Sequence, residues 1–247
     1  MDPPVNQIPT AAVDGPPAGW ARLARALWPP RCLACREPGQ GALDLCAACA
    51  RDLPWNRCAC SHCALPLPAP GVCGACLRKP PPLDAVRAAF VYAAPLDQWL
   101  RRFKFHDDLA AGRLLAALMA ADPQRPPALP AATALVAVPL ARRRLRARGY
   151  DQGRELARPL ARALGVPLLG GALRRVRDTA AQSRLDAPAR RRNLRGAFLA
   201  TFDGAPPPRV LLVDDVMTTG ATLHAAAAAL KRAGVAQVEA WVCARVP

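Results

Sequence analysis

The sequence of 247 residues is long enough for one large or two modest domains, and its formal net charge is +16. No apolar run reaches the roughly 20 residues of a membrane-spanning helix. The N-terminus also lacks the segments of a secretory signal, so we expect a cytoplasmic protein without a transmembrane segment. The positive charge is concentrated in residues 142–195, where 16 arginines stand against 4 acidic residues. Such a field attracts polyanions such as pyrophosphate, nucleotides or nucleic acid.

Residues 1–18 are rich in proline, alanine and glycine and contain little that a core would bury, so we expect a disordered leader. Apolar residues recur at helical spacing from Trp20 to Trp28, and Pro29 ends the segment. This pattern predicts a short amphipathic helix that packs on the following module.

Eight of the ten cysteines form four Cys-x-x-Cys pairs, a spacing that lets two thiolates converge on one tetrahedral zinc ion. The predicted ligands are Cys32, Cys35, Cys46, Cys49, Cys60, Cys63, Cys73 and Cys76. Four protein ligands leave no open position, so we expect two structural Zn²⁺ sites. The spacing allows a sequential pairing and an interleaved ribbon equally well. Cys58 and His62 fall out of register, and we interpret them as a spare thiol and a surface residue.

Residues 19–83 are therefore predicted to form a helix plus a double four-cysteine zinc-finger domain, in which zinc replaces a core that about 50 residues cannot build alone. Zinc-bound thiolates leave the first 83 residues with a net charge of about −1, which makes this module a poor clamp for nucleic acid. The proline-rich segment Leu77–Pro82 predicts a stiff linker to a second domain, residues 84–247.

The second domain alternates strand and helix patterns. We expect strands at Ala85–Ala93 and Thr133–Val138, helices at Leu96–Phe103 and Leu109–Ala121, and an edge strand at Val238–Val246. The apolar face of the second helix would include Leu109. Core packing is favoured for Phe103 and Phe105 over a base-stacking role, and Cys243 is expected to be buried and inert.

A basic loop is predicted at Pro139–Gly149, between the end of one strand and a helix at Tyr150–Leu164. It forms a second anion site suited to pyrophosphate, unless it is only a solvated loop. Its arginines are also the candidate nucleic-acid face: Arg142, Arg143, Arg144 and Arg146. Residues 173–198 are polar and weakly periodic, which is typical of a lid or hood.

The strongest pattern is the sequence of residues 210–222, Val-Leu-Leu-Val-Asp-Asp-Val-Met-Thr-Thr-Gly-Ala-Thr. A buried strand ends in two carboxylates, and a small hydroxyl-rich turn leads into the helix Leu223–Arg232, which stops before Gly234. The turn offers N–H groups and a helix N-terminus to a phosphate. The carboxylates Asp214 and Asp215 suit sugar hydroxyls or Mg²⁺. The candidate phosphate-binding residues are Thr218, Thr219, Gly220, Ala221 and Thr222.

This motif resembles the phosphoribosyl-pyrophosphate (PRPP) motif of type I phosphoribosyltransferases. From about Pro29 to Val246 the chain as a whole resembles the ComF (competence protein F-like) family. Besides the motif and the Cys-x-x-Cys pairs, the resemblance rests on Phe103–Phe105, Arg148–Gln152, Thr179-x-x-Gln182 and Arg192–Asn193, with Asp151 standing where the family often has asparagine. It implies an α/β, type I phosphoribosyltransferase-like open, mostly parallel sheet with an N-terminal zinc-binding domain. It also implies a link to natural transformation and imported single-stranded DNA, with other competence proteins as partners.

Two functions follow as hypotheses. In the first, the domain binds PRPP and transfers its ribosyl phosphate to an acceptor, as in nucleotide salvage, with Asp214 and Asp215 as catalytic residues. Mg²⁺, Arg148 and Lys104 would then stabilise the departing pyrophosphate. In the second, the protein is a binding module whose basic face holds single-stranded DNA during uptake. Membership of a family does not by itself decide between turnover and binding. We favour a competence-linked protein that binds PRPP or a sugar phosphate, with an active phosphoribosyltransferase of nucleotide salvage or related metabolism as the alternative.

Overall fold

We describe the protein from a computed structural model. It describes residues 29–41, 43–122, 125, 129–130, 132–177, 194 and 196–247. The expected leader and the helix before Pro29 lie outside these residues. In the part of the chain that is described, every helix is too short or too polar to cross a lipid bilayer.

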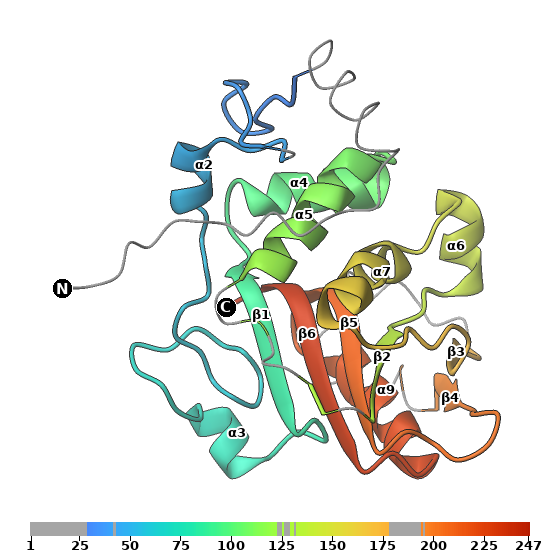
Figure 1. The fold of residues 1–247 in the computed structure, drawn as a ribbon. Coiled ribbons are helices and arrows are strands. Elements are labelled where there is room, and N and C mark those ends of the chain that lie inside the picture. The colour runs from blue at the N-terminus through green and yellow to red at the C-terminus, as the bar shows by residue number, and fades with distance from the viewer. Residues whose placement is uncertain are drawn as a thin grey trace.

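The centre of the molecule is a four-stranded sheet in which every neighbouring pair is parallel (Figure 1). In spatial order its strands are β1 (Ala85–Val91), β6 (Gln237–Arg245), β5 (Arg209–Met217) and β2 (Thr133–Ala137). The apolar runs of β5 and β6 are buried on both faces, as parallel strands covered by helices require. The fold is thus the mixed α/β architecture with a parallel sheet that the sequence predicts.

The last strand is not at the edge of the sheet, so that expectation was wrong. β6 lies between β1 and β5, because its residues 240–244 are apolar on both sides and each side is covered. Cys243, on this strand, is fully buried, and burial raises the pKa of its thiol. That placement confirms it as a packing residue.

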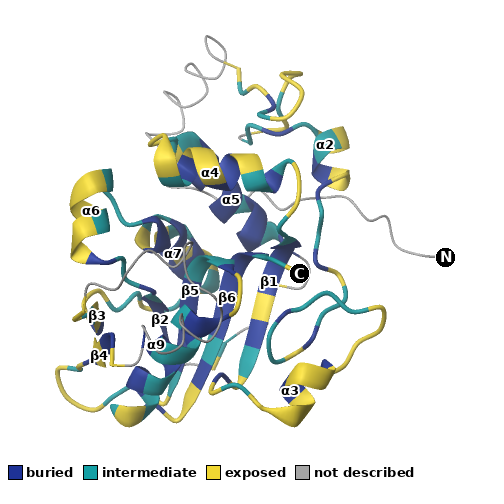
Figure 2. Cartoon of the chain, turned by 180° about the vertical axis from the view of Figure 1, so that it is seen from behind, coloured by how far each residue is buried: buried dark blue, intermediate teal, exposed yellow. Residues whose placement is uncertain are grey.

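Helices cover both faces of the sheet (Figures 1 and 2). One layer contains α4 (Leu96–Phe105), α5 (Leu109–Ala121) and α7 (Gln152–Leu164), which pack on Leu211 and Val213 of β5. The alternate residues of the strand, Val210 and Leu212, face α9 (Ala221–Arg232) on the opposite side. The two-residue period of the strand therefore sorts its side chains into two cores.

Two local expectations need correction. Leu109 is 43% exposed. It is the first residue of α5, directly after the capping residue Asp108, and the buried residues of this helix begin only at Ala111. The predicted basic loop contains a helix, α6 (Arg142–Arg148), which ends at Gly149 in the left-handed conformation. Arginine is a good helix former, and glycine is the favoured residue at such an end.

The cysteine-rich module packs along the free edge of β1. It contains two short helices, α2 (Ala47–Arg51) and α3 (Gly74–Arg78), so the first residues of the expected linker are helical. Its chain pairs with the strand through N–H···O bonds from Asn56 to Ala89 (2.9 Å) and from Val91 to Pro54 (2.8 Å). The module therefore covers an edge that would otherwise expose unpaired backbone groups.

Beside β2, a small antiparallel pair is formed by β3 (Leu173–Arg175) and β4 (Phe198–Ala200). These strands are the two ends of the expected hood. Most of the segment between them lies outside the described residues, and so do Thr179, Gln182, Arg192 and Asn193.

Candidate functional site

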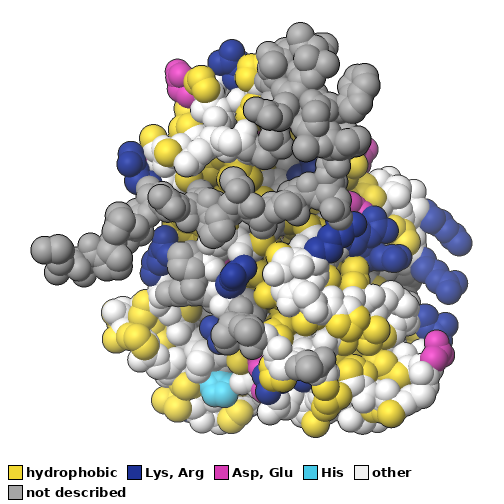
Figure 3. Space-filling model, in the orientation of Figure 1, with side chains coloured by type: hydrophobic (Ala, Val, Ile, Leu, Met, Phe, Trp, Pro, Cys, Tyr) yellow, Lys and Arg dark blue, Asp and Glu magenta, His cyan; other side chains and the backbone are white. Residues whose placement is uncertain are grey.

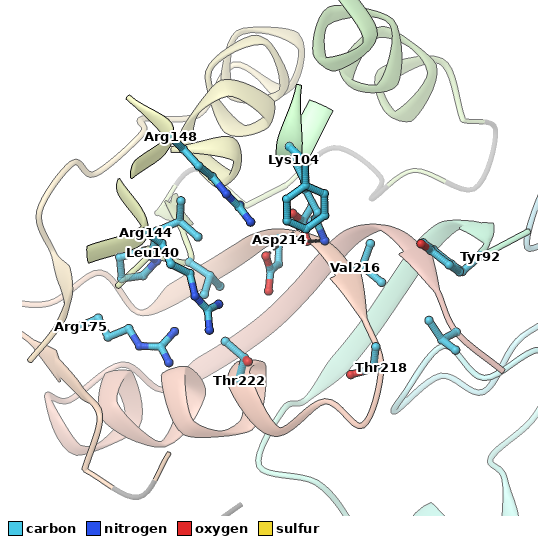
Figure 4. Close-up of a pocket in the computed structure, with 15 residues that line it drawn as sticks. Tyr92, Lys104, Leu140, Arg144, Arg148, Arg175, Asp214, Val216, Thr218 and Thr222 are labelled. Atoms are coloured by element: carbon cyan, nitrogen blue, oxygen red, sulfur yellow. Dashed lines mark hydrogen bonds and ion pairs between the residues drawn. The ribbon is translucent and has the colours of Figure 1, made fainter. Parts of the chain in front are cut away.

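A pocket of about 500 Å³ opens at the carboxyl ends of β5 and β2, where parallel α/β sheets place their ligands. Its lining comes from several elements. β5 contributes Asp214 and Asp215, and the turn after it contributes Thr218 and Thr222 (Figure 4). The other polar groups are Lys104 from α4, Arg144 and Arg148 from α6, Arg175 from β3, and Tyr92 from the end of β1.

The acid pair forms part of the strand itself, since β5 continues to Met217. The backbone N–H of Asp215 donates to Asp214 Oδ1 at 2.9 Å, and Lys104 Nζ lies 2.9 Å from Asp215 Oδ1. Burial first, and the neighbouring Asp215 second, raise the pKa of Asp214 to about 8. Near neutral pH the protonated form of the Asp214 carboxyl is therefore favoured.

The turn 218–222 supplies the start of α9. Gly220 precedes the helix in the left-handed conformation (φ 74°), and a Cβ on it would lie 2.5 Å from Met217 Cε. Because glycine has no side chain to cap the helix, the positive end of the helix dipole faces an anion at this turn without a competing side-chain cap. Thr218 and Thr222 line the pocket, whereas Thr219 is exposed and Gly220 and Ala221 form the turn.

The arginines of α6 divide between two faces. Arg144 and Arg148 are four residues apart, so they share one face, and both point into the pocket (Figure 4). Burial lowers the pKa of the Arg148 guanidinium, with the positive charge of Arg144 adding to this and Asp215 opposing it. Of the four predicted DNA-face residues, Arg142, Arg143 and Arg146 are exposed and lie outside the pocket lining, whereas Arg144 lines the pocket. Figure 3 shows a concentration of basic side chains over this part of the molecule.

The two phenylalanines of the Phe-Lys-Phe sequence have different environments. Phe103 is fully buried, and Tyr150 packs on it with 5.7 Å between ring centroids while donating its hydroxyl to the Phe103 carbonyl. Phe105 is 65% exposed at the mouth of the pocket, so the expectation of core packing was wrong for this residue. It is two residues further round the helix, which turns it away from the core, and the Arg148 guanidinium lies 5.0 Å from its ring centroid.

Asp151 fixes the basic segment to the scaffold. Its Oδ1 accepts the N–H of Arg154 (3.2 Å) and caps α7, while Oδ2 accepts the N–H of Leu140 (3.4 Å) from the loop before α6. Burial raises the pKa of this carboxyl. An asparagine side-chain oxygen can accept at the same helix cap, but its amide nitrogen cannot accept the Leu140 N–H, so only the aspartate makes both bonds.

Sequence reasoning missed Tyr92, Arg175 and the pocket role of Phe105. Tyr92 directly follows β1, and residues that end parallel strands meet at one edge of the sheet. That position was a usable signal. Arg175 lies in the segment expected to form the hood, where nothing in the sequence distinguishes one arginine from another.

The cysteines form two separate groups of four, in sequential order. Within each group all sulfur atoms lie within 4.8 Å of one another, which excludes the interleaved pairing. The sulfur atoms of Cys35 and Cys46 and those of Cys63 and Cys73 are 3.7 Å apart. A tetrahedral ion with Zn–S bonds of about 2.3 Å requires about 3.8 Å, so the donors fit zinc. Cys58 and His62 belong to neither group, and His62 is partly buried rather than on the surface.

The fold and the two clusters define an α/β protein with a phosphoribosyltransferase-type domain and a double zinc ribbon. Residues 23–77 match the family described as "Double zinc ribbon domain", and residues 151–247 match "Phosphoribosyl transferase domain". The chain is 35% identical over 225 residues to Competence protein F of Haemophilus influenzae, covering 87% of this chain and 96% of that protein. It is 35% identical over 222 residues to DNA utilization protein YhgH of Salmonella typhi (88% and 97%) and 34% identical over 226 residues to that of Escherichia coli K12 (88% and 97%). The chain belongs to this ComF family.

Proposed function

We propose that the pocket binds PRPP or a related 5-phosphorylated sugar, together with Mg²⁺. The observation that supports this is the meeting of three features in one cavity of about 500 Å³. These are an uncapped helix N-terminus, a pair of acids and two inward-facing arginines. Each feature suits a different part of one ligand: phosphate, sugar hydroxyls and pyrophosphate.

The residues have distinct roles in this proposal. The turn Thr218–Thr222 holds the 5-phosphate, Asp214 and Asp215 accept hydrogen bonds from the ribose hydroxyls, and Arg148 with Lys104 contacts the pyrophosphate. When bound, Mg²⁺ would neutralise pyrophosphate oxygens through oxygen ligands. Binding of a cationic group near the acids favours loss of the Asp214 proton, since the pKa of about 8 lies close to neutrality.

The same geometry supports transfer as well as binding. As the bond from the sugar C1 to the pyrophosphate oxygen breaks, positive charge develops at the sugar, and the two carboxylates stabilise it. An acceptor nitrogen forms the new bond to C1, loses its proton to solvent, and pyrophosphate leaves. The exposed ring of Phe105 beside Arg148 is a surface on which a planar acceptor can stack.

Isothermal titration calorimetry with PRPP and Mg²⁺ tests the binding proposal. We expect a saturable signal for the wild type, lost in Asp214→Asn/Asp215→Asn and kept in Asp203→Asn, which removes an exposed acid outside the pocket. An absent signal in the wild type would overturn the proposal. Release of pyrophosphate in the presence of nucleobases separates transfer from binding alone.

A second function, contact with single-stranded DNA, is favoured by the outer face of α6, where Arg142, Arg143 and Arg146 are exposed. Each lost phosphate contact reduces the slope of log affinity against log salt by about 0.7 for single strands. We therefore expect Arg142/Arg143/Arg146→Ala to flatten the slope by about 2, measured by fluorescence anisotropy. Arg36/Arg51/Arg78→Ala removes the same charge from the zinc ribbon and is the control. Equal slopes in the two variants would contradict the assignment.

The names of the relatives, competence protein and DNA utilization protein, support a role for this chain in using imported DNA. In a naturally transformable host we expect Asp214→Asn/Asp215→Asn to lower the frequency of transformation while the protein level stays unchanged. Normal transformation by that variant would separate the pocket from DNA use.

A further inference from the structure

Arg245, the last residue of β6, connects the second zinc site to the ends of β5 and β6 beside the pocket. Its Nε donates to the carbonyl of Cys63 at 2.9 Å, and Cys63 is one of the four thiols of that site. Its Nη1 lies 3.4 Å from the carbonyl of Met217 and also contacts the carbonyl of Val246. One guanidinium thus spans a zinc-ligand loop and the ends of two central strands.

Met217 stands at the point where the strand carrying the acid pair becomes the phosphate-binding turn. Thr218 follows Met217 in the chain. The Met217 side chain lies against Gly220, where a Cβ would lie 2.5 Å from Met217 Cε. The Met217 carbonyl also accepts the N–H of Val246 at 3.0 Å, and Val246 lines the pocket. A shift of this carbonyl is therefore transmitted to the turn.

The second zinc site is joined to the domain by further contacts. The N–H of Val86 on β1 donates to the Ser61 carbonyl at 2.9 Å, inside the Cys60-x-x-Cys63 loop. Ala64, directly after this loop, is fully buried in the core cluster that contains Met217 and Ala221. The first site differs. Among the described residues 32–50, the backbone hydrogen bonds stay within their own ribbon, and Cys32 packs in the cluster of α4 and α5 instead.

A bound zinc ion fixes the backbone of its ligand loop, and with it the Cys63 carbonyl. Without that anchor, the guanidinium of Arg245 loses one of its acceptors and constrains the Met217 carbonyl less, which leaves the Val246 N–H as the other donor to that carbonyl. We propose that Arg245 is a positioning residue through which the second zinc site orders the phosphate-binding turn. By thermodynamic reciprocity, a ligand in the pocket also strengthens retention of zinc at this site. The expected effect of a pocket ligand on zinc retention rests on the proposed sugar-phosphate function.

The test compares Arg245→Gln, Arg245→Lys, Cys63→Ser and the control Cys35→Ser, which removes an exposed thiol of the first site. Without any ligand, we expect amide hydrogen exchange of residues 218–223 to accelerate about tenfold in Arg245→Gln and Cys63→Ser. Arg245→Lys, which keeps one donor, should fall between, and Cys35→Ser should match the wild type. Zinc content should stay at two ions per chain in Arg245→Gln, which a general loss of structure would not allow.

With PRPP and Mg²⁺, Arg245→Gln and Cys63→Ser should each raise Kd about tenfold, and Arg245→Gln/Cys63→Ser should be no weaker than either alone. PRPP should slow release of one of the two zinc ions in the wild type and not in Arg245→Gln. If exchange of residues 218–223 in Arg245→Gln equals that of the wild type, the inference is overturned, whether or not Cys63→Ser folds. If the wild type fails to bind PRPP, only the proposed function falls, because the exchange measurement needs no ligand.

Discussion

Asp214 is part of the proposed binding site, but its ionised carboxylate should lower the stability of the fold. We therefore expect Asp214→Asn to raise that stability. The folded protein raises the pKa of Asp214 from 3.8 to about 8, through burial and the adjacent Asp215. Asparagine has nearly the same shape, and its side-chain oxygen can keep the 2.9 Å bond from the Asp215 N–H. The substitution therefore removes the ionisation and little else.

Stability changes with pH in a direction set by which state, folded or unfolded, binds the Asp214 proton more tightly. Because the folded-state pKa is the higher one, the favourable contribution of this group is complete below about pH 4 and is lost as pH rises towards 8. Four pKa units set a ceiling of about 6 kcal/mol on the loss. The carboxyl reaches the pocket and its water, which screens the effect, so we expect about 2 kcal/mol near pH 8. For a chain of this length, that raises the Tm of Asp214→Asn above the wild type by about 4–8 °C.

Thermal unfolding between pH 5.5 and 9 measures the effect, with acid avoided because protonated thiols release zinc. The difference in Tm between Asp214→Asn and the wild type should grow up to about pH 8 and then level off. Asp203→Asn, at an exposed loop position, should show no such growth. If the plots of Tm against pH for Asp214→Asn and the wild type run parallel, a raised pKa at this carboxyl is refuted.

Three other substitutions or treatments test separate parts of the molecule. Tyr150→Phe removes the hydroxyl donor to the Phe103 carbonyl and should lower the free energy of unfolding by about 1 kcal/mol, measured by urea denaturation. Gly220→Ala places a Cβ 2.5 Å from Met217 Cε at a left-handed residue. It should weaken PRPP binding at least tenfold in calorimetry and destabilise the fold by about 1–3 kcal/mol; unchanged affinity would contradict the role of the turn. A chromophoric chelator should remove two zinc ions in two phases, the faster one from the site containing exposed Cys35; after Cys35→Ser only the slow phase should remain.

Local patterns predicted the parts of the site that lie close together in the chain. The strand, acid pair, turn and helix of residues 210–222 are contiguous, so their order alone indicates their geometry. The four Cys-x-x-Cys pairs are equally local, and the existence of two zinc sites followed from spacing. Which pairs combine did not follow, because it depends on how the ribbon folds back, and the sulfur distances decided it.

Errors arose where the outcome depends on distant neighbours. The position of β6 inside the sheet is decided by pairing with β1 and β5, which are far away in sequence. Its unbroken apolar run at 240–244 was a signal of burial on both faces that the edge assignment overlooked. The exposure of Phe105 follows from the helical period, which turns it away from the side of the buried Phe103. Its contact with Arg148 depends on α6, which is distant in sequence.

The arrangement of charge on α6 explains how one short helix can serve two anionic ligands. Five arginines in Arg142–Arg148 cannot all enter one pocket, because burial disfavours each guanidinium and its charged neighbours add to that cost. Burial first, and Arg144 to a lesser extent, lower the pKa of Arg148. The 3.6-residue period sends Arg144 and Arg148 inwards, where Asp215 opposes their charge, and leaves the other three in solvent. The inward pair suits a compact, highly charged group such as pyrophosphate, and the outer three present their charge to solvent, where a nucleic-acid backbone can reach them. The two proposed functions therefore use different faces of the same helix, so that Arg148→Ala should impair sugar-phosphate binding while the salt dependence of DNA binding stays that of the wild type.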